Sequence, residues 1–149
     1  SALLGICESI STEAEAAQKL EETALKAKKF YKIDLEIEEK EDIIIVSTED
    51  LVRKIIELKE KGVPISEIAL SFHWAIIEAS LKVVERIKEK YGIKKVALNG
   101  GAFQNKILLK ELWGELKKCD FEVFLPQKTP LNDGGIALGQ IIIGREKLL

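Results

Sequence analysis

The stretch that decides the fold runs Val96-Ala97-Leu98-Asn99-Gly100-Gly101-Ala102-Phe103-Gln104-Asn105, and a second one of the same kind follows as Pro130-Leu131-Asn132-Asp133-Gly134-Gly135-Ile136-Ala137-Leu138-Gly139-Gln140. In each, a strand or the loop after a strand meets a glycine pair, and the pattern predicts that a helix starts again behind it. A helix N-terminus presents unpaired N–H groups and a partial positive charge, and glycine lets an anion approach the backbone closely. The two stretches together predict a phosphate site.

The segments around these glycine pairs predict a parallel βαβ unit. Residues 96–98 and 121–125 are short apolar runs that predict strands, and Leu109, Leu112 and Leu116 give the segment between them a helical face. A connection long enough to hold a helix implies parallel strands and a right-handed crossover. Because ligands of open α/β sheets bind at the carboxyl ends of the strands, we expect both glycine loops to line one crevice.

The N-terminal part of the chain predicts a helix followed by a hairpin. Thr12 and Glu15 have the spacing of a capping box, and the apolar residues behind them predict a helix over residues 13–29. Alternating apolar residues at 33–37, a polar turn at 38–42 and an apolar run at 43–46 then predict two antiparallel strands.

Two further helices are predicted between the hairpin and the first glycine pair. Ser47 marks the start of one, which Gly62 and the proline after it end. Ser66 is the expected N-cap of the other, a long helix that runs toward Gly92. The fold class is therefore α/β, with one domain over residues 1–149.

Composition excludes some classes of function. The formal net charge of −2 provides no basic field that would attract nucleic acid, so a nucleic-acid partner is not expected. No apolar run reaches the roughly 20 residues that span a bilayer, and the N-terminus lacks the basic region and long apolar core of a signal peptide, so we expect a cytoplasmic protein with no membrane partner. The chain has no methionine, which suggests that it is part of a longer protein.

Several side chains allow more than one interpretation. A glycine pair after a strand is often only a tight turn, and Asn132-Asp133 is also a good N-cap with an acidic first turn. His73, the one histidine, lies among apolar residues, and a satisfied, partly buried imidazole is favoured over a ligand-facing or proton-handling role. Cys7 and Cys119 lack the spacing of a zinc site and are predicted to be reduced structural thiols.

The two glycine motifs are also similar to those of a known protein family. They resemble the C-terminus of HypF, the carbamoyltransferase of [NiFe]-hydrogenase maturation. The resemblance extends to Ser11-Thr12-Glu13-Ala14-Glu15-Ala16-Ala17, which is similar to the family's Ser-Tyr-Glu-Gly-Gln-Ala-Ala pattern, and to the pair Phe72-His73. It implies the second lobe of a domain that is similar to the tRNA threonylcarbamoyl transferases, with the actin-like ATPase (ribonuclease H-like) fold.

The resemblance also implies site residues. Gly100, Gly101 and Gly134 would bind the phosphates of ATP or carbamoyl-adenylate through backbone N–H groups, and Asn105 would open the helix that follows. Asp133 would bind a divalent metal whose other ligands, histidines in the family, lie outside this chain. Glu13 and Glu21 match a helix that faces the nucleoside sugar in the related transferases, although Ala14 and Glu15 replace the family's Gly and Gln.

The implied reaction moves a carbamoyl group from carbamoyl-adenylate, made from carbamoyl phosphate and ATP, to the C-terminal cysteine of a hydrogenase maturation partner. The chain would need the upstream lobe of its own polypeptide, so the isolated fragment is expected to be inactive. Two alternatives remain open: a lobe of a tRNA threonylcarbamoyl transferase, and a non-catalytic lobe that binds nucleotide or docks a partner.

Overall fold

The computed structural model describes residues 1–41 and 43–148, so Asp42 of the predicted turn lies outside the described residues. The regular elements, in chain order, are α1 (Glu15–Ala24), β1 (Ile37–Lys40), β2 (Ile43–Val46), α2 (Thr48–Glu60), α3 (Ile65–Tyr91), β3 (Lys95–Ala97), α4 (Lys106–Lys118), β4 (Glu122–Phe124) and α5 (Ile136–Leu148). Short 3-10 turns at Ala2–Leu4, Gly101–Gln104 and Asp133–Gly135 complete the structure.

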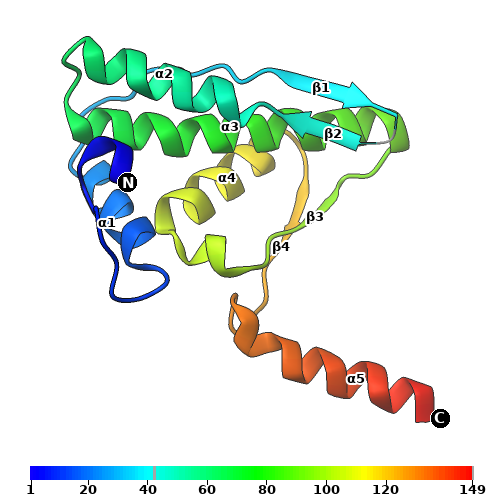
Figure 1. Cartoon of the computed structure of the whole chain (residues 1–149). Coiled ribbons are helices and arrows are strands. Elements are labelled where there is room, and N and C mark those ends of the chain that lie inside the picture. Colours follow the sequence, from blue (N-terminus) through cyan, green and yellow to red (C-terminus); the bar gives the residue numbers. More distant parts are fainter. Residues whose placement is uncertain (42, 149) are drawn as a thin grey trace.

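Helix α3 is the central element of the fold. Helices α1, α2 and α4 all pack against it (Figure 1). Its N-terminal part is buried on several faces, and Ile68 and Ala69 have no exposed surface. The helix ends at Gly92, whose φ of 70° is the left-handed conformation that glycine adopts without a steric penalty. The predicted long helix is therefore confirmed.

The buried apolar residues form two clusters along α3. The first joins α1, α2 and the N-terminal part of α3, and the second joins α3 to the βαβ unit. The buried members of the second cluster are Ile77, Leu98, Leu112, Leu116 and Phe121. This second cluster fixes α4 and its two flanking strands on α3, and it therefore sets the place of the first glycine loop.

The two sheets have the predicted directions. Strands β3 and β4 are parallel, with Val96 opposite Val123, and β1 and β2 are antiparallel, with Ile37 opposite Val46. Each sheet has two strands among the described residues, and the two sheets are separate. The prediction of a mixed α/β fold with a parallel βαβ unit and an antiparallel hairpin is confirmed.

The predicted start and end of α1 are wrong. Ala14 is the N-cap, and the carboxylate of Glu15 accepts hydrogen bonds from the N–H and the hydroxyl of Ser11, each at 2.7 Å, so Thr12 forms no capping box. These bonds and the ion pair with Lys19 lower the pKa of Glu15 to about 2, with Lys19 making the largest contribution. The helix ends at Ala24 instead of residue 29.

Contacts with the core, and not pairing with another strand, hold the segment between α1 and the hairpin in place. Ile33 and Leu35 are almost fully buried in the first cluster, and the N–H of Tyr31 donates to the hydroxyl of Ser71 on α3 at 2.8 Å. These contacts hold the segment against α3 without a strand partner. Strand β1 therefore begins at Ile37 and not at Ile33.

The predicted N-cap of α3 is also wrong. The cap is Pro64, whose carbonyl accepts from the N–H groups of Glu67 and Ile68, and Ser66 lies in the first turn. Proline has no N–H to satisfy and its φ is already restricted, so it is a suitable residue at the boundary of a helix. A serine near a helix start is thus not always the residue that caps it.

Replacing Ser47 with alanine is expected to lower the free energy of unfolding by about 1 kcal/mol. The hydroxyl of Ser47 accepts from the N–H of Asp50 at 3.2 Å at the start of α2, and alanine leaves that donor without its partner. Chemical denaturation followed by circular dichroism measures the change. Ser66→Ala is the matched control, because the Ser66 side chain does not cap α3, and an equal loss in both variants would contradict the assignment.

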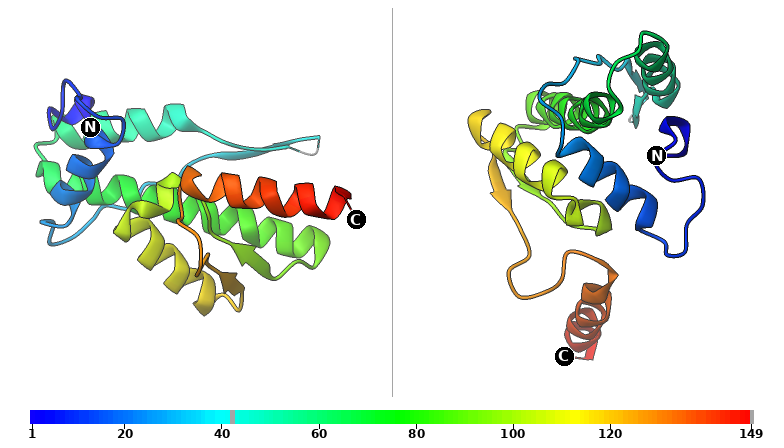
Figure 2. Two further views of the ribbon diagram at one scale, coloured as in Figure 1. Left: turned by 90° about the horizontal axis from the view of Figure 1, so that it is seen from below. Right: turned by 90° about the vertical axis from the view of Figure 1, so that its left-hand side faces the viewer.

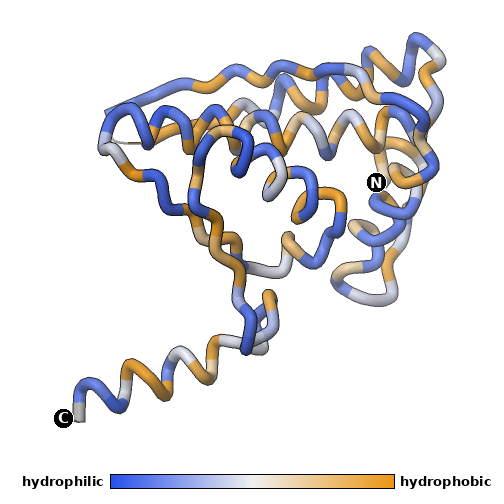
Figure 3. Tube along the Cα trace, turned by 180° about the vertical axis from the view of Figure 1, so that it is seen from behind, coloured by the Kyte–Doolittle hydropathy of each residue, from blue (hydrophilic) through white to orange (hydrophobic). Residues whose placement is uncertain are grey.

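Helix α5 lies apart from the rest of the molecule (Figures 1 and 2). Apolar residues recur along its length (Figure 3), and those with more than two fifths of their surface exposed are Ile136, Leu138, Ile141, Ile142 and Ile143. An apolar helix without a covering surface is typical of an interface. Among the described residues, none of the helices combines the length and apolar character needed to cross a membrane.

Candidate functional site

The two glycine loops lie next to each other, as the sequence predicts. The N–H of Gly100 donates to the carbonyl of Leu131 at 2.7 Å, so one hydrogen bond joins the loop after β3 to the loop after β4. Gly100 has φ 112° and ψ 160°, a region that is essentially restricted to glycine. The space next to the Cα atoms of Gly100 and Gly101 is open, so a ligand can approach this backbone.

A short turn separates the first glycine pair from the helix behind it. Residues Gly101–Gln104 form a 3-10 turn, in which the N–H of Phe103 donates to the carbonyl of Gly100 at 3.0 Å, and α4 begins only at Lys106. The glycine pair therefore does not form the N-terminus of α4. Its N–H groups belong to the turn that leads into the helix.

The N-terminus of α4 already has its own partners. The side-chain oxygen of Asn105 accepts from the N–H of Leu108 at 2.9 Å, and a carboxylate oxygen of Glu21 on α1 accepts from the N–H of Lys106 at 2.7 Å. Asn105 is thus the N-cap of α4, which confirms its predicted place at the helix start. The carboxylate of Glu21 occupies the position at which a helix N-terminus favours an anion.

His73 contacts this N-cap directly. Its Nε2 lies 2.9 Å from Nδ2 of Asn105, and its Nδ1 lies 2.7 Å from the carbonyl oxygen of Ala69. The side chain is 1% exposed, and burial lowers its pKa, against the opposing effects of the Ala69 carbonyl and the Glu21 carboxylate. The expectation of a satisfied imidazole is confirmed, and the ring is more deeply buried than expected.

A cavity of about 230 Å³ lies where α1, α3 and the Gly101–Gln104 turn meet. Three separate parts of the sequence contribute to its lining. The polar side chains and the residues of the first glycine motif that line it are Gln18, Glu21, His73, Gly101, Gln104 and Asn105. The structure thus brings Gly101 and Asn105 together with the carboxylate of Glu21. Gly100 is joined to this wall through the turn but does not line the cavity.

The second glycine loop is folded on itself. The side-chain oxygen of Asn132 accepts from the N–H of Gly134 at 3.1 Å, and its carbonyl accepts from the N–H of Gly135 at 3.1 Å. A Cβ on Gly134 would lie 3.1 Å from the side-chain oxygen of Asn132 and 3.2 Å from Pro130, so a larger residue there would need these side chains to shift slightly. The interpretation of Asn132 as an N-cap is confirmed, and Asp133 and Gly134 lie outside the lining of the 230 Å³ cavity.

The residues expected to bind the sugar and the metal lie outside the cavity lining. Glu13 and Asp133 are both exposed, and Glu13 precedes α1 without lining the cavity. Within residues 1–41 and 43–148, no three His, Cys, Asp or Glu side chains are grouped so that they could hold a metal ion. The described residues alone therefore do not provide a complete metal site, and Asp133 would be one ligand of it.

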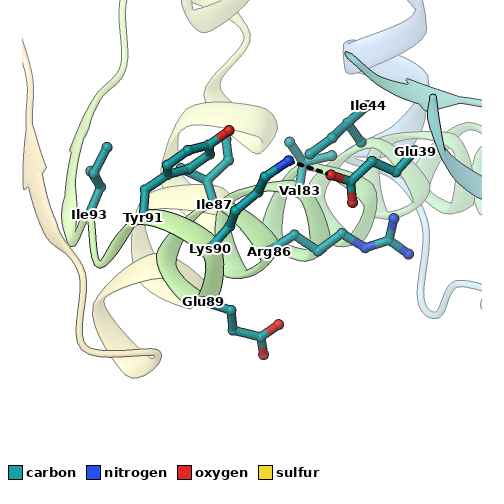
Figure 4. Close-up of a pocket in the computed structure, with 9 residues that line it drawn as sticks. All are labelled: Glu39, Ile44, Val83, Arg86, Ile87, Glu89, Lys90, Tyr91 and Ile93. Carbon is teal, nitrogen blue, oxygen red and sulfur yellow. Dashed lines mark hydrogen bonds and ion pairs between the residues drawn. The ribbon is translucent and has the colours of Figure 1, made fainter. Parts of the chain in front are cut away.

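A larger groove of about 800 Å³ lies elsewhere, between the β1–β2 hairpin and the C-terminal part of α3 (Figure 4). Its floor is apolar, and Lys90 forms an ion pair with Glu39 at 2.8 Å across it. None of the residues predicted from the sequence lines this groove. Its acidic and basic side chains also balance each other, which gives no particular attraction for a phosphate.

Neither cysteine of the described chain forms a disulfide. Burial raises the pKa of the Cys119 thiol, with Glu85 adding to the effect, so the neutral thiol is favoured. Cys7 is buried and its sulfur contacts the carbonyl of Ser9 at 3.1 Å. These surroundings are those of structural thiols.

Comparison with known proteins identifies the family of this arrangement. Residues 1–140 match the family model described as "Carbamoyltransferase, Kae1-like Domain, second subdomain". The chain belongs to the HypF carbamoyltransferase family. The match includes both glycine motifs and the His73 and Glu21 positions that surround the cavity.

The similar proteins are much longer than this chain. A probable carbamoyltransferase HypF from Methanocaldococcus jannaschii is 31% identical over 140 residues, which cover 94% of this chain and 18% of that protein. A crystal structure of full-length HypF in the phosphate- and nucleotide-bound form superposes with a TM-score of 0.89 at 37% identity and covers 99% of this chain and 19% of that one. The chain therefore spans about a fifth of its HypF relatives.

A second group of relatives consists of tRNA threonylcarbamoyltransferases. A tRNA N6-adenosine threonylcarbamoyltransferase from Thermotoga neapolitana is 27% identical over 82 residues, which cover 55% of this chain. The HypF relative from Methanocaldococcus jannaschii matches over 94% of this chain, which is far more of the chain than this threonylcarbamoyltransferase matches. The prediction of a HypF-like lobe, related to the threonylcarbamoyl transferases, is confirmed.

Proposed function

We propose that this chain forms one side of the nucleotide-binding cleft of a HypF carbamoyltransferase, as the second lobe of an actin-like ATPase fold. The observation that carries the proposal is the Gly100–Leu131 hydrogen bond, because it fixes the two glycine loops side by side next to an open backbone. Backbone N–H groups in such a loop are suitable donors to phosphate oxygens. The full-length HypF structure in the phosphate- and nucleotide-bound form supports the choice of ligand.

The residues proposed to contact the nucleotide differ in how accessible they are to a ligand. Gly101 lies in the cavity wall beside Asn105, and its backbone is open to a ligand. The N–H group of Gly100 already donates to Leu131, and that of Gly134 donates to Asn132. These two glycines therefore position the loops, and each would bind a phosphate oxygen only in place of its present acceptor. Glu13 is assigned to the sugar, from the exposed segment that precedes α1.

The proposed reaction is carbamoyl transfer from carbamoyl-adenylate to the C-terminal cysteine of a hydrogenase maturation partner. The cysteine thiolate attacks the carbamoyl carbon, a C–S bond forms, and the C–O bond to the phosphate breaks with AMP as the leaving group. N–H donors at the glycine loops stabilise the charge that develops on the phosphate side. This chain positions and stabilises the leaving group, and the nucleophile comes from the partner.

Asp133 is proposed as a single ligand of a divalent metal. Such an ion is commonly held by one or two carboxylates together with phosphate oxygens of the substrate, and it neutralises phosphate charge. The remaining protein ligands would come from the upstream lobe. The apolar surface of α5 is the part of this chain best suited to pack against that lobe, because it is exposed here.

Replacing Asp133 with alanine is expected to weaken the binding of ATP with Mg²⁺ at least about tenfold, because the carboxylate is the metal's protein ligand on this chain. Isothermal titration calorimetry of the purified chain measures the affinity. Asp34→Ala is a matched control, since Asp34 is exposed and pairs with Lys32 and Lys82 away from the glycine loops. Equal affinities in the unchanged chain and both variants would contradict the metal assignment.

Two alternatives are decided by the same titration and one further assay. The threonylcarbamoyl transferases share part of this sequence, and threonylcarbamoyl transfer to tRNA in a reconstituted enzyme would favour that activity. The Phe-Gln-Asn that comes shortly after Gly100-Gly101 and the formal net charge of −2 favour the HypF reaction. No ATP binding at all by the chain would support a docking lobe.

A further inference from the structure

We propose that His73 is a positioning residue of the nucleotide site, because it holds the side-chain amide of Asn105 in the one orientation that caps α4 and keeps the Gly101–Gln104 turn at the cavity. The inference rests on the proposed function for the ligand and on the structure for the contacts. His73 lies on α3, whereas Asn105 lies at the start of α4. The hydrogen bond between them therefore links the central helix to the glycine turn.

The direction of each hydrogen bond in this chain of contacts is fixed by chemistry. The Ala69 carbonyl only accepts, so Nδ1 of His73 carries the proton and donates to it. In a neutral ring Nε2 is then an acceptor, and it receives the Nδ2–H of Asn105. The N–H of Leu108 needs an oxygen, which the same amide provides from its other side. Each of the three hydrogen bonds therefore joins one donor to one acceptor.

A reversed Asn105 amide would break two of these contacts. Its NH₂ group would face the N–H of Leu108, donor against donor, and its oxygen would face the lone pair of Nε2. Burial opposes protonation of the imidazole, so Nε2 of His73 remains an acceptor. The ring therefore favours one orientation of the Asn105 amide. Buried donors and acceptors that lose their partners are costly, so the fixed orientation also holds the turn in place.

This arrangement changes how Asn105 takes part in binding. Its oxygen is used by Leu108 and one amide hydrogen by His73, so Asn105 contributes mainly by placing the turn that precedes it. Glu21 stabilises the same helix start through the N–H of Lys106. The cavity wall made by Gly101 and Gln104 is therefore held by α1 on one side and by α3 through His73 on the other.

Nuclear magnetic resonance of the ¹⁵N-labelled chain tests the contact without any ligand. The unchanged chain is expected to show a scalar coupling across the hydrogen bond between Nε2 of His73 and Nδ2 of Asn105, and the Nδ1-protonated tautomer of the ring. Absence of the coupling in the unchanged chain would overturn the proposal. His73→Phe keeps a ring of similar size but no acceptor, and should make hydrogen exchange of the Leu108 amide about fivefold to tenfold faster, as for loss of an N-cap.

A conservative variant separates positioning from space-filling. In His73→Gln the terminal oxygen lies at about the place of Nε2 and can accept from Asn105, so slow Leu108 exchange should be largely kept. A role in packing alone predicts the opposite order, because phenylalanine fills the space better than glutamine. Faster exchange in His73→Gln than in His73→Phe would therefore overturn the proposal.

Asn105→Asp tests the same contact even where His73→Phe fails to fold. Aspartate still caps α4 but has no N–H for Nε2, so His73 is expected to bind a second proton and become an imidazolium beside the new carboxylate. Its ring ¹⁵N shifts report this change, and a ring that stays neutral with the unchanged tautomer would overturn the proposal.

Binding of ATP with Mg²⁺ connects the contact to the site. His73→Phe is expected to weaken binding about fivefold to tenfold and His73→Gln to restore most of it; equal binding in all three chains would overturn the positioning role. If the unchanged chain binds no ATP, the proposed function and the ligand part of this inference are both wrong. The coupling and exchange data in that case still decide whether His73 orients Asn105.

Discussion

Replacing Leu116 with alanine is expected to lower the free energy of unfolding by about 3–5 kcal/mol. Leu116 on α4 is 1% exposed and packs in the second core cluster with Ile77 and Phe121, so its removal leaves a cavity that is enclosed on several sides. Both the lost transfer energy and the unfilled space destabilise the folded chain. Urea denaturation followed by circular dichroism measures the change.

Leu138→Ala is the matched control, since it removes the same atoms from the exposed helix α5. Leu138 has 45% of its surface exposed, and the change is expected to stay within about 0.5 kcal/mol. Similar losses in the two variants would mean that α5 packs on the rest of the isolated chain, against the structure. A large difference would confirm that the cluster between α3 and the βαβ unit supports the fold.

The isolated chain is expected to transfer no detectable carbamoyl group, which is a loss of more than about 10³-fold relative to a full-length enzyme. It forms one side of the proposed cleft, and its described residues contain no complete metal site. The assay supplies carbamoyl phosphate, ATP, Mg²⁺ and a partner that ends in cysteine, and measures the mass of the partner.

Adding back the missing part tests the reason for this inactivity. A polypeptide that provides the other four fifths of a HypF relative, such as the one from Methanocaldococcus jannaschii, is expected to restore transfer when it is joined to this chain. The same fusion with Asp133→Ala is the control and should remain at background. Turnover by the isolated chain would contradict the two-lobe account.

The sequence predicts most of the elements but not all of their ends. Alternating or helical spacing of apolar residues is visible in the sequence, so the hairpin, the long helix α3 and the parallel strands are as expected. The early end of α1 and the extended segment after it depend on Ile33 and Leu35 reaching the core and on Tyr31 bonding to Ser71. Such contacts between distant residues override local propensity and leave no periodic signal.

For the site, the motifs predict the neighbourhood but not the hydrogen bonds. The contact between Gly100 and the loop at Leu131 follows from parallel strands, and the place of Asn105 at a helix start follows from its residue type. Glu21 at the N-terminus of α4 and His73 on Asn105 join residues that are far apart in sequence. The resemblance of Phe72-His73 to the family pattern is the sequence signal that points to His73.

The proposed function depends on the binding of nucleotide phosphates by the two adjacent glycine loops. Titration of the ¹⁵N-labelled chain with ATP and Mg²⁺, observed through every backbone amide, tests it most directly. The amides of residues 100–105 and 132–135 are expected to shift together with one affinity, while those around the groove of Glu39 and Lys90 remain unchanged. Shifts confined to that groove, or shifts in one glycine loop without the other, would contradict it.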